Sequence, residues 1–242
     1  MIDINCDMGE VDELLDDGTY EALMSYVTSI NVACGAHAGD ERMMRTMVKL
    51  AKKKNVKIGA HPSYPDRKNF GRFDLDISDE ELTSSISDQI VCLINIAAEQ
   101  NCSISHVKPH GALYNSAAKN EKLANLIGDV IKSIDPSLPI MCLAGSQMVK
   151  TLKSMGMKVL PESFADRTYE PDGSLRKRTY SNALILDPQV SSLQAYNISN
   201  NNKIIAHDGS EISIESKTLC VHSDTPDALA IAKSIKKKLN RS

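Results

Sequence analysis

The sequence predicts an α/β fold, an irregular seven-stranded (β/α) TIM-like barrel with one unit fewer than the usual eight. Strand-like segments alternate with helix-like segments along the chain, which is typical of a parallel sheet. Most of these strands have one aliphatic face and one small or polar face that ends in an ionisable residue. No Gly-x-Gly-x-x-Gly follows the first strand, which disfavours the main competitor, an open Rossmann-type sheet.

The composition favours one protein domain with a substantial core. The 242 residues contain no linker or break in composition and are 42% hydrophobic, so we expect a single barrel domain over residues 1–242. A net charge of -3 gives no reason to expect nucleic acid or a membrane as partner, and no apolar run reaches the roughly 20 residues that span a bilayer. Six cysteines without Cys-x-x-Cys spacing, and a chain that starts directly with a strand, predict a cytoplasmic protein with reduced thiols.

The first three expected strands cover residues 1–6, 30–37 and 56–61. Because side chains alternate across a strand, Asn5 and Asp7 share one face of the first strand. His37 ends the small-residue face of the second strand, and His61 ends that of the third. The expected helices here are a short amphipathic segment within 14–27, a helix over 43–51 capped by Asp40, and one over 82–97 opened by a capping box at 78–81.

The fourth strand begins at His106 and runs into a turn before Asn115. His106, Lys108 and His110 occupy alternate positions, so their three ionisable side chains project to one face. Burying two imidazoles and an ammonium group is unfavourable unless they meet partners, a metal or a substrate. This face is therefore the first candidate for chemistry.

The second half of the chain supplies strands over 139–144, 158–162 and 218–222. The first of these is wholly apolar, the second ends at Glu162 and leads to Asp166 and Arg167, and the third ends at His222. The remaining expectations are helices over 123–134 and 146–152, a polar loop over a cleft at 168–186, a short helix and a hairpin within 188–216, and a last helix that starts at 225–226.

The carboxyl ends of barrel strands meet at one rim, where active groups stand. The candidates are Asp7, His37, His61, Lys108, His110, Glu162, Asp166 and His222. A single terminal histidine is more often structural, but several from different strands together with a carboxylate resemble a hydrolytic site that binds a divalent metal or moves protons. For a metal the candidates are Asp7, His37 and His61, although no compact motif such as His-Glu-x-x-His is present.

Three cations could hold a substrate anion. Lys108 either forms a salt bridge with a carboxylate of the barrel mouth (Asp7, Glu162 or Asp166) or binds a substrate carboxylate or phosphate. Arg72 and Arg167 follow strands and could make bidentate contacts, although most loop arginines are only solvated. The chain has no P-loop, no Gly-x-Ser-x-Gly elbow and no cysteine marked as an activated nucleophile.

Long blocks of the sequence resemble the LamB/YcsF family. The matching blocks are residues 4–10, 31–40, 59–66, 106–115, 164–167 with 172–173, and 220–226. Members of this family are the A subunit of the prokaryotic ATP-dependent 5-oxoprolinase. The resemblance implies a barrel similar to the carbohydrate deacetylase and glycoside hydrolase-like barrels, work in a complex with subunits B and C, and cleavage of 5-oxo-L-proline (pyroglutamate) to L-glutamate while ATP is hydrolysed to ADP and phosphate.

Opening a lactam requires a base for water, stabilisation of the tetrahedral oxygen and an acid for the leaving nitrogen. As a hypothesis, the catalytic residues are Asp7, His61, His110, Glu162 and His222. The substrate-binding residues are Lys108, Asn5, Arg72, Asp166 and Arg167. Because the chain has no recognisable nucleotide motif, we expect the chemistry of ATP, the co-substrate, to depend largely on the partner subunits.

Two other functions are compatible with the same residues. A metal-dependent deacetylase of a small N-acetyl compound would contain a divalent ion and act without ATP. A non-catalytic barrel subunit would serve only assembly or ligand sensing, and alanine at His61 and Lys108 would leave its complex fully active.

Overall fold

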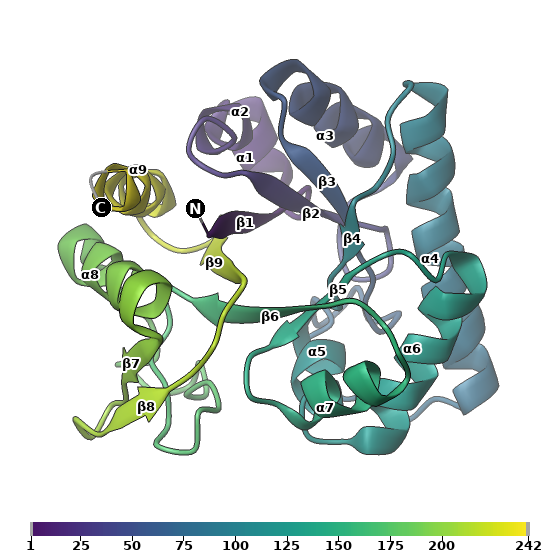
Figure 1. Ribbon diagram of the computed structural model, residues 1–242. Helices are drawn as coiled ribbons and strands as arrows, with labels where there is room; N and C mark the ends of the chain where they lie inside the picture. The colour runs from purple at the N-terminus through teal and green to yellow at the C-terminus, as the bar shows by residue number, and fades with distance from the viewer. Residues whose placement is uncertain (1, 241–242) are drawn as a thin grey trace.

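The computed structural model describes residues 2–240, which form a closed barrel of seven parallel strands surrounded by helices (Figure 1). The order around the barrel is β1-β2-β3-β4-β5-β6-β9, so the last strand closes on the first. The predicted seven-stranded (β/α) barrel is confirmed. Its strands are β1 (Asp3–Met8), β2 (Ser29–Ala33), β3 (Lys57–His61), β4 (His106–Val107), β5 (Ile140–Leu143), β6 (Val159–Phe164) and β9 (Thr218–His222).

Helices follow most strands and cover the outside of the barrel (Figure 1). They are α1 (Asp12–Asp16), α2 (Thr19–Leu23), α3 (Glu41–Lys54), α4 (Asp79–Glu99), α5 (Gly111–Ala117), α6 (Glu121–Ile134), α7 (Gln147–Ser154), α8 (Pro188–Asn201) and α9 (Ala228–Leu239). Neighbouring helices pack in the order α3, α4, α6, α7 on one side, and α8, α9, α2 on the other. The predicted caps are confirmed at Asp40, which accepts from the Met43 N–H, and at the Ser78–Glu81 capping box.

The strands alternate between an aliphatic outer face and a polar inner face. Ile4, Cys6 and their counterparts on the next strands are buried against the helices. Residues that pair across parallel strands point to the same side, and the register pairs Asp7 with Asn31 of β2 and with His222 of β9. Polar side chains from distant parts of the sequence therefore meet inside the barrel near the carboxyl ends of its strands.

The chain between β6 and β9 departs from a simple strand–helix unit. It contains α8 and then a two-stranded antiparallel sheet of β7 (Lys203–Ile205) and β8 (Glu211–Ser213), which confirms the predicted hairpin. α8 has 14 residues and is longer than the short helix expected; it begins where Asp187 caps it and Pro188 fits its first turn. α9 begins at Ala228, slightly later than expected.

Two local predictions were wrong. β2 ends at Ala33, so His37 lies in a loop and does not end a strand. Gly35 and Gly39 in that loop have φ of +92° and +71°, and a Cβ at Gly39 would lie 2.7 Å from the Gly9 carbonyl oxygen. The turn at these glycines carries His37 back over the barrel. In addition, the chain after His110 forms α5 where the sequence predicted a turn.

The six cysteines are free thiols, and four of them are buried. Within residues 2–240 no helix combines the length and apolar character that crossing a membrane requires.

Candidate active site at the barrel mouth

A buried lysine stands at the centre of the barrel mouth. The Lys108 ammonium lies 2.9 Å from Asp7 Oδ1 and 3.0 Å from Glu162 Oε1. It also donates to Asn5 Oδ1 at 3.3 Å and to Cys220 Sγ at 3.2 Å. We call Lys108 and these four partners the lysine network. Its members come from β1, β6, β9 and the segment after β4, so only the closed barrel brings them together.

Burial and charge act against each other in the lysine network. Burial disfavours the charged form of Asp7 and is the largest single effect, but Lys108, His61 and His222 together outweigh it and hold the pKa of Asp7 well below its ordinary value. Burial also disfavours the Lys108 ammonium, yet Asp7, Cys220 and Glu162 together keep the pKa of Lys108 well above its ordinary value. Burial raises the pKa of Glu162 further than Lys108 lowers it. At neutral pH Asp7 and Lys108 form an ion pair, and Glu162 is the group more easily protonated.

Neutral side chains complete the lysine network. The Asn5 amide donates to Glu162 Oε1 at 2.8 Å and to Thr218 Oγ1 at 2.7 Å. The Asn31 amide donates to Asn5 Oδ1 and to Asp7 Oδ1, both at 2.7 Å. The Tyr114 hydroxyl donates to Glu162 Oε2 at 2.7 Å. Buried carboxylates need such donors, and here each carboxylate has at least one besides the ammonium.

His106 supports this network and takes no part in chemistry at the mouth. Its Nε2–H donates to Asn31 Oδ1 at 2.7 Å, and its Nδ1 accepts from the Ser105 hydroxyl at 2.8 Å. Burial lowers the pKa of His106 to about 4, so the ring is neutral. The ring lies across Gly59, where a Cβ would be 2.1 Å from His106 Nε2. Both ring nitrogens are satisfied by the protein.

Next to the lysine network lies a group of four residues that we call the histidine cluster: Glu10, His37, His61 and His110. Glu10 Oε1 lies 2.9 Å from His37 Nε2, 3.2 Å from His110 Nδ1 and 3.8 Å from His61 Nε2. His61 Nε2 is 3.0 Å from His110 Nδ1 and 3.6 Å from Asp7 Oδ2. All four side chains are buried, and the rings of His37 and His110 stack 3.8 Å apart.

Backbone carbonyls fix the tautomers of two of these rings. His61 Nδ1 lies 2.7 Å from the Lys108 carbonyl oxygen, and His110 Nε2 lies 2.9 Å from the Phe70 carbonyl oxygen. A carbonyl oxygen only accepts, so these nitrogens carry the hydrogens, and in the neutral rings His61 Nε2 and His110 Nδ1 present lone pairs. Burial lowers the pKa of His61 to about 3, which keeps that ring neutral. Lone pairs therefore face each other and the Glu10 carboxylate.

A third arrangement pairs Asp166 with His222. His222 Nδ1 donates to Asp166 Oδ2 at 2.9 Å, and the same oxygen accepts from the His222 backbone N–H and the Thr225 hydroxyl. Burial opposes ionisation of Asp166, but His222 outweighs it and lowers the pKa of Asp166. The carboxylate thus fixes the tautomer of His222 and leaves Nε2 to exchange a proton. Donor atoms of His222, Asp7 and Cys220 lie within 4.8 Å of one another, which joins this pair to the lysine network.

The two arginine candidates lie farther out. Arg72 is exposed on the loop after β3 and pairs with Asp224 at 2.7 Å. Arg167 is buried and donates to the carbonyl oxygens of Arg176 and Ala183, so it holds the segment after β6. Both are available to a substrate anion only if these contacts change.

The sequence analysis missed Glu10 and gave no role to Tyr114. Glu10 follows Gly9, whose φ of +78° ends the strand geometry, so the period-two pattern assigned it no direction. A signal did exist, because Glu10 belongs to the block 4–10 that resembles the family. Tyr114 lies on α5, the helix that forms where a turn was expected, and its contact with Glu162 requires that helix.

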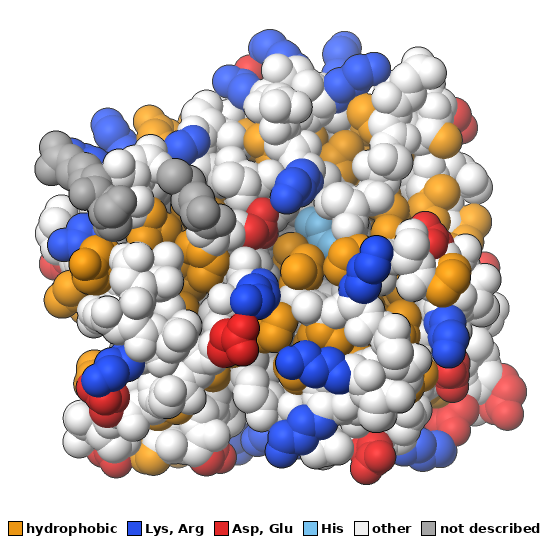
Figure 2. All heavy atoms as spheres, in the orientation of Figure 1, with side chains coloured by type: hydrophobic (Ala, Val, Ile, Leu, Met, Phe, Trp, Pro, Cys, Tyr) orange, Lys and Arg blue, Asp and Glu red, His pale blue; other side chains and the backbone are white. Residues whose placement is uncertain are grey.

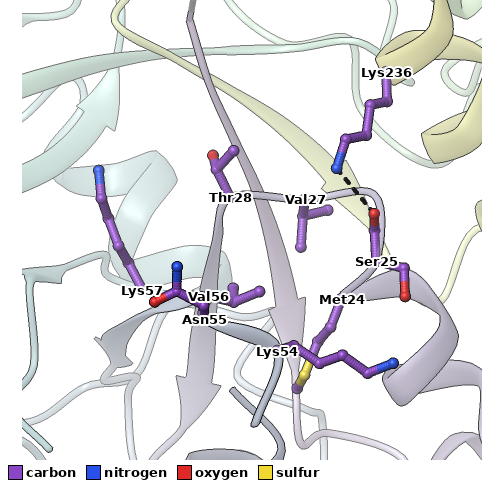
Figure 3. Close-up of a pocket in the computed structure, with 9 residues that line it drawn as sticks. All are labelled: Met24, Ser25, Val27, Thr28, Lys54, Asn55, Val56, Lys57 and Lys236. Atoms are coloured by element: carbon purple, nitrogen blue, oxygen red, sulfur yellow. Dashed lines mark hydrogen bonds between the residues drawn. The ribbon is translucent and has the colours of Figure 1, made fainter. Parts of the chain in front are cut away.

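The opposite end of the barrel has a different character. A pocket of about 680 Å³ lies where β2 and β3 begin, and its lining includes Lys54, Lys57 and Lys236 (Figure 3). Figure 2, in the orientation of Figure 1, shows lysine and arginine side chains around a central area where apolar side chains lie beside a histidine and acidic side chains. Lys236 donates to the Ser25 carbonyl oxygen at 2.9 Å. None of the candidate site residues lines this pocket.

Comparison with known proteins places the chain in a family. The family model described as LamB/YcsF matches residues 2–242. The chain belongs to the LamB/YcsF family. Within it, a protein of Halalkalibacterium halodurans, named as the A subunit of 5-oxoprolinase, is 42% identical over 98% of this chain and 93% of its own length. A Staphylococcus aureus protein of the same name is 40% identical over 98% of this chain and 95% of its own length.

A solved LamB/YcsF-like barrel agrees with the fold. The crystal structure of a lactam utilization protein from Thermus thermophilus superposes with a TM-score of 0.92 at 33% identity. The match covers 99% of this chain and 96% of the other, so the whole closed barrel is shared.

Proposed function

We propose that this chain is the A subunit of a 5-oxoprolinase and supplies the barrel in which the lactam ring of 5-oxo-L-proline is opened to L-glutamate. The observation that carries the proposal is the name shared by relatives that match nearly the full chain. The site supports it, because an ionised carboxylate, Asp7, lies beside an imidazole whose tautomer is fixed, His222.

The proposed reaction uses ATP because a lactam carbonyl is a weak electrophile. Transfer of the γ-phosphoryl group to the lactam oxygen releases ADP and activates the carbon. Water adds to that carbon, and the C–N bond breaks as the nitrogen takes a proton, which leaves γ-glutamyl phosphate. A second water molecule hydrolyses the acyl phosphate to L-glutamate and phosphate, so one ATP and two waters are consumed for each ring opened.

Asp7 is the proposed base and His222 the proposed acid. Lys108 and Asn31 hold Asp7 Oδ1, which leaves Oδ2 to take a proton from water. His222, oriented by Asp166, delivers a proton to the leaving nitrogen. Positioned proton transfer of this kind contributes roughly 10²–10⁴-fold to rate. Glu162 is the second candidate for the acid that protonates the leaving nitrogen, because burial raises its pKa.

The substrate carboxylate is assigned to the arginines and not to Lys108. The Lys108 ammonium already contacts two carboxyl groups, Asp7 and Glu162, so another anion would have to displace one of them. Arg72 is exposed, and its ion pair with Asp224 can be replaced by one with a substrate carboxylate at a small cost in free energy. Arg167 is the second candidate for this role.

Phosphoryl transfer is proposed to depend on partner subunits. The chain has no P-loop, so ATP would be bound and used with subunits B and C of the same complex. The free thiols of all six cysteines fit a reducing compartment, and we place the reaction in the cytoplasm.

The test is glutamate release from 5-oxoproline by this chain with candidate subunits B and C, with and without ATP. We expect release only with ATP, and a fall in kcat of at least about 100-fold for Asp7→Asn and for His222→Gln. His207→Gln is the matched control, because His207 pairs with Glu170 at 2.8 Å outside the mouth. Wild-type turnover in Asp7→Asn would refute the role of Asp7. Failure to release glutamate with ATP and both partners would refute the reaction, and release from an N-acetyl compound without ATP would favour a deacetylase.

A further inference from the structure

The histidine cluster has the composition and spacing of a metal centre. We infer that Glu10, His37, His61 and His110 bind one divalent ion of the zinc type. The inference goes beyond the proposed function, because binding of the ion can be measured without either substrate. It also differs from the set expected from the sequence, since Glu10 and His110 take the place of Asp7.

The distances fit a four-coordinate ion. Zinc lies about 2.0–2.1 Å from histidine nitrogen and carboxylate oxygen, so neighbouring ligand atoms of a tetrahedral site are about 3.3 Å apart. Glu10 Oε1 lies 2.9, 3.2 and 3.8 Å from the nitrogens of His37, His110 and His61, and the nitrogens of His61 and His110 are 3.0 Å apart. These values bracket the tetrahedral spacing, and donor atoms of all four residues lie within 4.8 Å of one another.

The second contacts of the rings fit as well. A histidine that binds a metal usually donates its other ring N–H to a carbonyl or carboxylate, which fixes the ring and its tautomer. His61 does this with the Lys108 carbonyl oxygen and His110 with the Phe70 carbonyl oxygen. Without a cation, their lone pairs at 3.0 Å would repel each other unless a proton were taken up.

His37 provides an independent observation. It is buried, and its Nδ1 has no hydrogen-bond partner in the described part of the chain. Buried imidazoles are normally satisfied at both nitrogens, as His106 is here. Its Nε2, 2.9 Å from Glu10 Oε1, is the nitrogen placed to bind an ion, and because Nδ1 has no partner, Glu10 is the one hydrogen-bonding group that holds this ring within the described residues.

The cluster is enclosed by a glycine that admits no side chain. A Cβ at Gly71 would lie 3.0 Å from His37 Cβ, 3.1 Å from His110 Cδ2 and 2.2 Å from Ser63 Oγ, and the φ of Gly71 is +62°. The loop therefore closes tightly over the imidazoles, and the donors are held in place before any ion binds.

Asp7 is a neighbour of this site and not one of its ligands. Its Oδ1 is occupied by Lys108 and Asn31, and its Oδ2 is 3.6 Å from His61 Nε2. With four protein ligands a tetrahedral ion has no open position, so it would polarise a carbonyl or phosphoryl oxygen of the substrate only by accepting that oxygen as a fifth ligand. This chain would then place the base, Asp7, directly beside the polarised group.

The test is direct binding to the purified chain after treatment with a chelator. Calorimetry with Zn²⁺ and the visible spectrum of added Co²⁺ should both show one ion per chain with four-coordinate geometry. Glu10→Gln and His110→Gln should each weaken binding at least tenfold. Asp7→Asn and the control His207→Gln should stay within about threefold of the wild type.

The wild-type chain provides a measurement that no folding defect can obscure. Zn²⁺ should shift the ¹⁵N resonances of His37 Nε2, His61 Nε2 and His110 Nδ1, and leave those of His106, His207 and His222 in place. Absence of stoichiometric binding, shifts confined to other histidines, or loss of binding in Asp7→Asn but not in Glu10→Gln would each overturn the inference. Uptake of a proton in place of an ion, seen as metal-independent protonation of His110, would overturn it too.

Discussion

The lysine network and the histidine cluster lie side by side in the barrel mouth, yet their polar atoms are satisfied to different degrees. Around Lys108 the charged groups meet opposite charges or amide and hydroxyl donors of the protein. In the cluster, two lone pairs face each other and His37 Nδ1 has no partner in the described residues. The comparison separates a network whose charges the protein itself balances, which holds Asp7 in position, from a cluster that is arranged for a ligand the chain itself does not supply.

Removal of Lys108 should have the largest effect. Lys108→Met leaves Asp7 and Glu162 buried without their cation, so we expect a loss of about 3–5 kcal/mol in the free energy of unfolding, measured by urea denaturation. Lys122→Met is the control, because its partner Asp79 is at the surface, and it should change stability far less than Lys108→Met does. Equal losses of stability in the two variants would mean that the buried ion pairs of Lys108 matter no more for the fold than the surface ion pair of Lys122.

Lowering the pH should reduce the free energy of unfolding through His106, which supports the lysine network. The pKa of His106 is about 4 in the folded chain and roughly 6.5 when unfolded, so between these values the unfolded chain binds more protons. The part of the stability that depends on neutral His106 should be complete above about pH 6.5 and fall by about 3 kcal/mol as the pH approaches 4, in addition to the loss from His61 in the same range. Urea denaturation of chelator-treated protein across this range measures the loss, and His106→Gln should make the dependence less steep. An unchanged slope in that variant would assign the loss to other groups.

Tyr114→Phe should have a smaller effect. It takes one donor from Glu162 Oε2 while the Lys108 and Asn5 contacts to Oε1 remain. Loss of one buried hydrogen bond to a carboxyl group is expected to reduce the free energy of unfolding by about 1–3 kcal/mol. Tyr180→Phe, at an exposed tyrosine, is the control, and thermal or urea unfolding compares the two. A loss no larger than that of the control would mean that Glu162 does not depend on this hydroxyl.

Arg72→Ala should have the smallest effect on stability. Its ion pair with Asp224 is exposed, and such pairs contribute less than about 1 kcal/mol. In the reconstituted complex the same variant should raise KM for 5-oxoproline more than it lowers kcat, because the proposed role of Arg72 is to bind the substrate carboxylate. An unchanged KM would remove Arg72 from the substrate site.

The parts of the fold and site that follow strand periodicity could be predicted from the sequence. Asn5 and Asp7 were placed on one face of the first strand. For Lys108 the sequence left open a salt bridge with Asp7, Glu162 or Asp166 and the binding of a substrate anion, and the structure shows contacts with Asp7 and Glu162. The aliphatic outer faces and the strand–helix alternation were enough to predict a closed barrel.

The parts that depend on turns could not be predicted. His37 reaches the cluster through the loop after β2, and Glu10 through a turn at Gly9, and neither conformation leaves a periodic pattern. The metal set expected from the sequence therefore contained Asp7 and omitted Glu10. The set inferred from the structure omits Asp7 because Lys108 already binds that carboxylate.

The contact between Gly59 and His106 links two positions that are far apart in the chain. No side chain fits at 59 while an imidazole occupies 106, since the added carbon would overlap the ring. The two positions should therefore change together during evolution, with a larger residue at 59 only in family members that have a smaller one at 106. An engineered replacement of His106 by a smaller residue would leave a void, and a residue with a side chain could then be accommodated at position 59.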